Sequence, residues 1–169
     1  MALPNPLEQR IGVIKYQGIV DIPGLLKMMR DWIIDHKYDF TEGSNKAKAG
    51  SDGIKKEIEW EGTKEVDDYF KYTIKMVINF YNVMDVEVVK GGQKQKLQSC
   101  RILIEIDAIV TMDYNEKFKK GKLLDRLKHF YHNNVIKYDI MFVHADGLYY
   151  HALKLHRAIK EYIGMETTK

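Results

Sequence analysis

Apolar side chains recur at every second position along two neighbouring stretches of this chain, residues 69–89 and 94–113. In both stretches the even-numbered positions carry most of the large apolar residues, among them Phe70, Ile78 and Ile104. Side chains on a β-strand alternate between its two sides, so this pattern predicts two long strands that each have one apolar face. We expect them to pair as an antiparallel hairpin, with the apolar face buried and the other face open to water or to a partner.

The glycines between these stretches predict how the hairpin closes. Both apolar faces lie on the same side of the sheet only if even-numbered residues pair with even-numbered residues. A three-residue loop at 91–93 satisfies this condition, and it predicts that Phe80 lies opposite Ile104 and Met84 opposite Cys100. A two-residue loop would instead set apolar residues opposite charged ones.

Two details qualify this hairpin. Asn82 places an amide in the apolar row, which indicates a bulge or a separate turn, and leaves open whether residues 69–89 form one strand or two. On the other face, the predicted register puts Lys71 opposite Asp113, so that opposite charges meet. That face is therefore expected to be polar.

Helical spacing of apolar residues predicts two elements that cover the sheet. Asp21 can cap a helix at 22–36, in which apolar residues recur at intervals of three and four. A second stripe with the same intervals runs from Met141 to Tyr162, and predicts a C-terminal helix long enough to cross the apolar face of the hairpin. Shorter patterns predict strands at 11–20 and 57–61, and a helix at 123–135.

The segment after the first helix is expected to be a mobile loop, because residues 41–53 are rich in Gly, Ser, Lys and Ala and contain no large apolar residue. Together these elements predict one α+β domain over residues 1–169. Its expected core is a long twisted antiparallel sheet of about 4–6 strands, packed against the helix at 22–36 and the C-terminal helix.

The order of these elements resembles the helix-grip architecture of START-like ligand-binding proteins, in which a curved sheet wraps a C-terminal helix. A single helix at 22–36 stands where that architecture usually has a pair of short helices. The resemblance implies an arrangement of sheet and helix. It implies no ligand and no site residues, because it rests on element order and on no sequence motif.

Composition narrows the class of protein. The chain has 169 residues, a formal net charge of +3 and one cysteine. That cysteine, Cys100, has no partner for an intramolecular disulfide and falls among the apolar positions, as expected of a buried thiol. The N-terminal segment lacks the apolar run of a signal peptide, and no stretch has the roughly 18 apolar residues of a membrane span. We expect a cytoplasmic protein, while export without such a signal stays open.

The long strands favour a non-catalytic assembly or interaction protein. Strands of roughly 20 residues far exceed the usual five or six, and they expose long edges that can pair with another chain. We therefore expect a homo-oligomer or a protein partner, with self-association through the sheet edges or the C-terminal helix. Whether the chain is an enzyme stays open, although the lack of a nucleophile elbow, phosphate loop or dinucleotide fingerprint argues against it. No catalytic residue and no cofactor is predicted.

The alternative is a pocket protein that binds an apolar small molecule. A sheet this long must coil, and the space between its concave face and the final helix can stay open instead of being filled. The residues expected to line that space are Tyr72, Met76, Phe80, Ile104, Ala108, Met141 and Tyr149.

A third reading is binding of a polyanion such as nucleic acid, which needs clustered cations and favours interleaved aromatic residues. The cations of the candidate segment are Lys117, Lys119, Lys120, Lys122, Arg126 and Lys128. The hairpin tip, residues 90–96, is a second basic patch. Because the charges of the whole chain nearly balance, nucleic acid is the least favoured of the partners.

Histidines and carboxylates offer weaker signals. Five of the six histidines fall in the last two predicted helices, at positions 129, 132, 144, 151 and 156. No cysteine or HExxH pattern accompanies them, so no metal site is predicted. Glu105 and Asp107 lie two positions apart on one strand face, as an acid and base pair would. Ion pairs to lysines on the neighbouring strand explain these carboxylates without catalysis.

Overall fold

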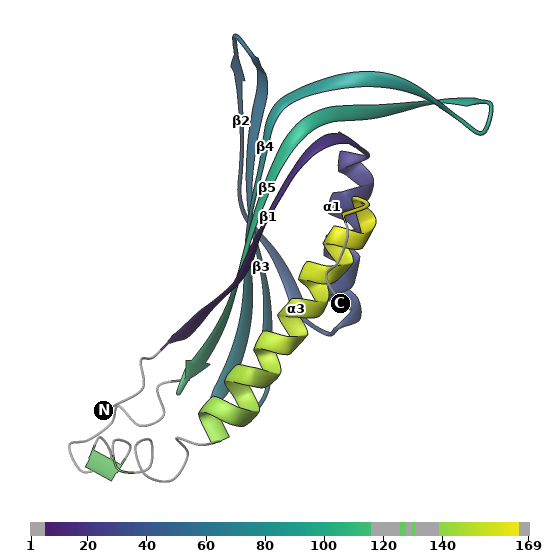
Figure 1. Cartoon of the computed structure of the whole chain (residues 1–169). Helices are drawn as coiled ribbons and strands as arrows, with labels where there is room; N and C mark the ends of the chain where they lie inside the picture. The colour runs from purple at the N-terminus through teal and green to yellow at the C-terminus, as the bar shows by residue number, and fades with distance from the viewer. Residues whose placement is uncertain (1–5, 116–125, 128–129, 131–138, 166–169) are drawn as a thin grey trace.

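The computed structural model describes residues 6–115, 126–127, 130 and 139–165. Within them, one antiparallel sheet has the strand order β1-β5-β4-β3-β2 (Figure 1). Its strands are β1 (Leu7–Val20), β2 (Asp39–Gly50), β3 (Gly53–Glu65), β4 (Phe70–Lys90) and β5 (Gln93–Met112). The described helical elements are α1 (Ile22–Asp35), the π-helical η1 (Asp139–Ala145) and α3 (Asp146–Tyr162). The predicted α+β class, with an antiparallel sheet packed against a C-terminal helix and one other helix, is confirmed.

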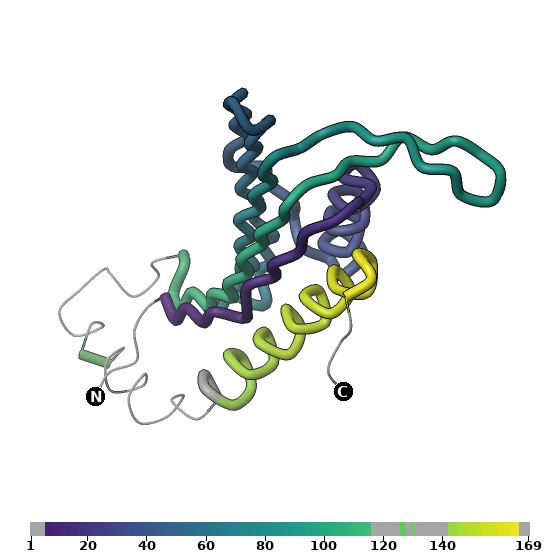
Figure 2. Tube along the Cα trace, turned by 45° about the horizontal axis from the view of Figure 1, so that its top comes forward, coloured from purple at the N-terminus to yellow at the C-terminus, as the bar shows by residue number. Residues whose placement is uncertain are grey.

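Helices α1 and α3 cover the same side of the sheet (Figure 2). Helix α1 begins at Asp21, whose side chain accepts a hydrogen bond of 3.1 Å from the Gly24 backbone N–H, as an N-cap does. It ends where Lys37 adopts a left-handed φ of 64°. Helix α3 buries four residues of the apolar stripe predicted from the sequence, Leu148, Ala152, Leu155 and Ile159, whereas Tyr162 at its end is 42% exposed. None of the described helices is long and apolar enough to cross a membrane.

The even-numbered positions of β4 up to Phe80, and those of β5 from Cys100 onward, form the core beneath these helices. They pack into one cluster with the buried faces of both helices, in which the fully buried strand residues are Ile74, Met76, Ile78, Phe80, Ile102, Ile104 and Ile106. Cys100 belongs to this cluster, and burial raises the pKa of its thiol. The alternation of the sequence therefore identified the buried face correctly for this part of the hairpin, up to Phe80 on β4 and from Cys100 on β5.

The hairpin between β4 and β5 closes differently from the prediction. Phe80 pairs with Ile102 and not with Ile104, and the turn contains two residues instead of three. These residues are Gly91 and Gly92, with φ angles of 58° and 79°. Two successive positive φ angles are typical of the type I′ turn, whose twist suits a two-residue hairpin.

A β-bulge at Asn82 explains how a two-residue turn coexists with a buried even-numbered face. The register shifts between Tyr81 and Met84, and Asn82 has a left-handed φ of 55°. The extra residue moves the even-numbered side chains of β4 to the opposite side of the sheet beyond this point. Met84 is therefore 57% exposed and pairs with Ser99, not with Cys100 as predicted. Residues 70–90 form one bulged strand.

The expected mobile loop at 41–53 is also wrong, because these residues lie in the hairpin of β2 and β3. The two strands pair from Asp39 opposite Thr63 to Gly50 opposite Gly53. Most side chains of β2 are exposed, as suits an edge strand that is held by backbone hydrogen bonds and buries little apolar surface. The helix expected at 123–135 lies largely outside the described residues.

Candidate interaction site

The far ends of β4 and β5 extend beyond the rest of the sheet as a two-stranded β-arm, residues 84–97 (Figures 1 and 2). The pairing of β1 with β5 ends at Gln98, and the pairing of β3 with β4 ends at Val83. Among the described residues, the strands of the β-arm thus pair only with each other. An isolated two-stranded hairpin is at best marginally stable in water, and its free edges are templates for another strand.

One side of the β-arm is apolar and faces away from the helices. Ile19 and Met84 both pair with Ser99 and so project from the same side, where they are 49% and 57% exposed. Gln98, the next residue, projects from the helix side, where its Oε1 accepts a hydrogen bond of 3.2 Å from the Ile22 backbone N–H. The outer apolar strip continues along the arm, and its residues are Ile19, Met84, Val86, Val88 and Leu97.

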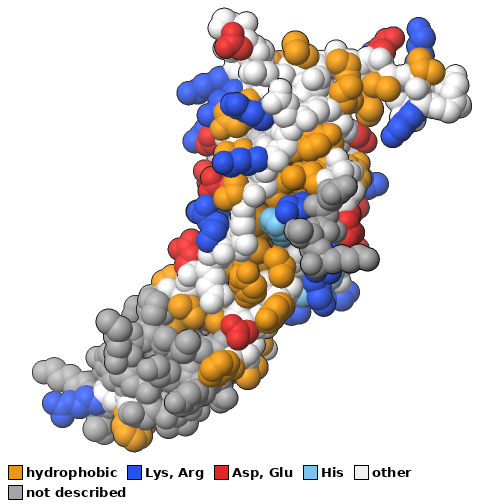
Figure 3. All heavy atoms as spheres, in the orientation of Figure 1, with side chains coloured by type: hydrophobic (Ala, Val, Ile, Leu, Met, Phe, Trp, Pro, Cys, Tyr) orange, Lys and Arg blue, Asp and Glu red, His pale blue; other side chains and the backbone are white. Residues whose placement is uncertain are grey.

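The opposite side of the β-arm carries charges near the turn. Lys96 pairs with Glu87, and Lys94 pairs with Val89. The Lys94 Nζ lies 3.9 Å from the Glu87 Oε2, and these four residues are exposed. They define the tip face of the β-arm. Figure 3 shows basic side chains on two sides of the far end of this arm.

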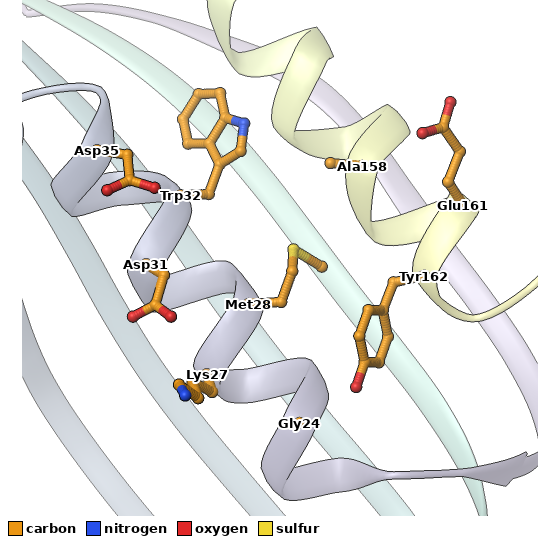
Figure 4. Close-up of a pocket in the computed structure, with 9 residues that line it drawn as sticks. All are labelled: Gly24, Lys27, Met28, Asp31, Trp32, Asp35, Ala158, Glu161 and Tyr162. Carbon is orange, nitrogen blue, oxygen red and sulfur yellow. The ribbon is translucent and has the colours of Figure 1, made fainter.

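A groove of about 640 Å³ lies between α1 and α3, on the helix side of the molecule (Figure 4). Met28 and Trp32 point from α1 toward α3, and Tyr162 points back from α3 (Figure 4). The α1–α3 groove is lined by Gly24, Lys27, Met28, Asp31, Trp32, Asp35, Ala158, Glu161 and Tyr162. Its rim therefore carries three carboxylates and one lysine around an aromatic and apolar floor.

Gly24 brings the two walls of this groove close together. A Cβ atom at this position would overlap the Tyr162 hydroxyl, so the glycine permits the ring to lie across the first turn of α1. Partial burial raises the pKa of the Tyr162 hydroxyl, and the nearby Asp21 carboxylate raises it further. The groove thus has a neutral phenol at one end and acidic groups along its rim.

Two tyrosine–histidine pairs join the C-terminal helical segment to the rest of the fold. The Tyr38 Oη lies 2.9 Å from the His151 Nδ1, and the Tyr72 Oη lies 2.8 Å from the His144 Nδ1. The pKa of His151 is lowered first by burial and then by the neighbouring His36. Both pairs are packed among aromatic rings, since His144 stacks on Phe70 at 3.8 Å between centroids. His151 thus connects α3 to the turn after α1, and His144 connects η1 to strand β4.

The residues predicted to line an apolar pocket lie mainly in the core. Met76, Phe80, Ile104 and Ala108 are buried in the hydrophobic cluster, and Tyr72 and Tyr149 pack partly buried against it. The side chain of Met141 lies outside the described residues. None of the six described residues lines the α1–α3 groove. Their role in ligand binding stays a prediction.

Of the six predicted polyanion-binding cations, the structure describes one. Arg126 is exposed, whereas Lys117, Lys119, Lys120, Lys122 and Lys128 lie outside the described residues. Polyanion binding by this segment therefore stays a prediction as well.

The strand carboxylates are held by a partner that the sequence did not suggest. The Arg10 Nη1 lies 3.1 Å from the Glu105 Oε2, and the Arg10 Nε also donates to Asp107. Lys71, the predicted partner of Asp113, pairs instead with Thr111. Within the described part of the chain, no three histidine, cysteine or carboxylate side chains are placed to hold a metal ion together.

No family model and no curated protein matches the chain. Among the described residues, the β-arm and the α1–α3 groove are two surfaces that a partner can contact.

Proposed function

We propose that this chain is a non-catalytic interaction protein that associates with further copies of itself through the β-arm. The observation that carries the proposal is a long hairpin that projects from the sheet, has one apolar side exposed, and pairs along neither edge with another strand of the described residues. Covering such an arm is favourable, because a partner strand would bind the backbone N–H and C=O groups along its edges and a partner surface would remove the outer apolar strip from water.

Burial within the monomer favours the β-arm over the C-terminal helix as the contact element. The apolar stripe of α3 is already occupied, because Leu148, Leu155 and Ile159 are almost fully buried against the sheet. A coiled coil between copies would have to remove these side chains from the core. The outer apolar strip can be covered without disturbing any buried residue.

The ion pairs on the outer face of the sheet support a structural role for its carboxylates. Arg10 contacts both Glu105 and Asp107, so these groups stabilise the β1–β5 pairing. Asp107 is 7% exposed and accepts a charge-assisted hydrogen bond from Arg10. This environment is typical of an ion pair that holds two strands together. It is less typical of a catalytic carboxyl group, which must exchange a proton with a substrate.

The test is light scattering on the full chain, from about 1 µM to about 100 µM, because association depends on concentration. The informative variant is Ile19→Thr/Met84→Thr, which changes the two side chains that flank Ser99. Loss of about 1–2 kcal/mol of apolar burial should weaken association by about 5- to 30-fold.

A matched control exists on the same face of the same strands. Val13 and Val77 flank Glu105 as Ile19 and Met84 flank Ser99. The variant Val13→Thr/Val77→Thr should leave association unchanged. A wild-type chain that stays monomeric throughout the range, or equal effects of the two variants, would contradict the proposal.

A further inference from the structure

We propose that the tip face of the β-arm of one copy docks in the α1–α3 groove of another copy. This inference rests on the proposed self-association and specifies which two surfaces meet. It assigns the groove an occupant: a second copy of this chain, presented through Lys94 and Lys96.

Charge is the first argument. The groove rim carries Asp31, Asp35 and Glu161 against a single Lys27, whereas the whole chain has a net charge of +3. Among the described residues, no ion pair engages any of the three carboxylates. The groove is thus a locally acidic surface on a basic protein, and complementary potentials guide such partners together.

Spacing is the second argument. Asp31 and Asp35 lie four residues apart on α1, which places them about 6 Å apart along the helix axis. Lys94 and Lys96 lie two residues apart on β5, which places them about 6.6 Å apart on one side of the strand. Each lysine of the tip face can therefore meet one carboxylate of the rim.

The remaining groups on both surfaces continue this match. Lys27 precedes the two aspartates on the same flank of α1 (Figure 4), and Glu87 accompanies the two lysines on the tip face. Val89 lies between the charges of the tip face and is 68% exposed. In the docked state it would pack on Met28 and Tyr162 in the floor of the groove of the other copy. In the docked state, the lysine and two aspartates of α1 would face the glutamate and two lysines of the tip face, beside the apolar contact of Val89.

The geometry requires two molecules. The β-arm projects past the helices and its tip lies away from the α1–α3 groove of its own chain (Figures 1 and 2). An arm docked in a neighbour's groove makes a heterologous contact, which leaves one free arm and one free groove at the ends unless a ring closes. The tip contact supplies orientation, and the outer apolar strip supplies further apolar area for the same assembly.

The test is a charge-reversal exchange on the full chain. An arm variant, Lys94→Glu/Lys96→Glu, and a groove variant, Asp31→Lys/Asp35→Lys, are each compared with the wild type by light scattering. Each variant alone places like charges on both surfaces, so its association should weaken by about 10-fold or more. An equimolar mixture should associate again, because the basic arm of the groove variant meets the acidic groove of the arm variant.

The control is Lys46→Glu/Lys48→Glu, which makes the same charge change on two exposed lysines of the edge strand β2. It should leave association unchanged, and circular dichroism should show all variants folded. If the wild type associates but either charge-reversed variant associates equally well, or if the mixture stays dissociated, the docking inference is overturned while self-association stands. If the wild type does not associate at all, the proposed function fails first.

Discussion

The Tyr38 hydroxyl and the His151 imidazole lie 2.9 Å apart, oxygen to Nδ1, between the turn that ends α1 and the middle of α3. Burial raises the pKa of Tyr38 and lowers that of His151, so the pair is formed by a neutral phenol and a neutral imidazole. The groups around His151 are cationic or aromatic: His36, Lys64 and Lys154 each disfavour a second positive charge. A proton on His151 would therefore loosen the contact between α3 and α1.

This relationship predicts how stability depends on pH. The pKa of His156 is also lowered, first by burial and then by Lys160, while both imidazoles titrate at about 6.5 in the unfolded chain. The unfolded state thus binds more protons below that pH, so the stability that the two neutral histidines provide is complete above about pH 6.5 and declines as the pH falls toward their folded values.

Urea denaturation between about pH 7.5 and pH 5.5 measures this effect, because few carboxylates titrate in that window. The free energy of unfolding should decrease across the window in the wild type. The variant His151→Gln/His156→Gln should be less stable at the higher pH but should show a flatter pH dependence. An unchanged slope would assign the pH dependence to other groups.

A second prediction concerns the bulge at Asn82, whose φ is 55°. Asparagine tolerates the left-handed conformation, whereas an ordinary side chain there costs about 1–2 kcal/mol. Asn82→Ala should therefore lower the midpoint of thermal unfolding by about 2–8 °C, and Asn82→Gly should have little effect or raise it slightly. If alanine and glycine behave alike in calorimetry, backbone conformation does not account for the choice of asparagine.

The bulge also shows how far the sequence could predict this fold. The recurrence of apolar residues at even-numbered positions identified the buried side of β4 up to Phe80 and of β5 from Cys100, because side chains alternate between the two sides of a strand and the core is formed by one side. This recurrence could not distinguish a three-residue turn from a two-residue turn with a bulge. Both arrangements keep the even-numbered residues of β4 up to Phe80 on the same side of the sheet as the even-numbered residues of β5. The amide at Asn82 was the only local signal, and it indicated the position of the bulge but not its effect on Met84.

The surfaces proposed for interaction depended on register and on tertiary packing. Met84 and Val86 belong by sequence to the same alternating row as Phe80, so their exposure became visible only with the bulge. Strand β2 was missed because small polar residues have low β propensity, although its pairing with β3 satisfies its backbone. The α1–α3 groove combines residues that lie over 120 positions apart, such as Asp31 and Glu161, and no local pattern relates them.

A third prediction tests how closely α1 approaches the sheet. A Cβ atom at Gly62 on β3 would lie 2.9 Å from the Cγ2 and 3.0 Å from the Cδ1 of the buried Ile33. Gly62→Ala should destabilise the protein by about 1–3 kcal/mol, because overpacking forces the helix or the side chain to shift. At Gly43 on β2 the nearest atom would be 3.5 Å away, so Gly43→Ala is the matched control and should change stability by less than about 1 kcal/mol. Similar losses at both sites would contradict a tight contact at Gly62.

The last prediction separates a filled core from a space for an apolar ligand. Ile104 is fully buried beneath α3, while the next residue toward the turn, Leu103, is only partly buried on the other face of β5. If side chains fill the space under the helix, Ile104→Ala should cost about 2–5 kcal/mol, because it removes apolar contacts and leaves a cavity. Leu103→Ala should cost clearly less, since water can reach its site. A loss at Ile104 below about 1 kcal/mol would favour a space that is already open, and binding of apolar compounds to the wild type should then be measured by thermal shift.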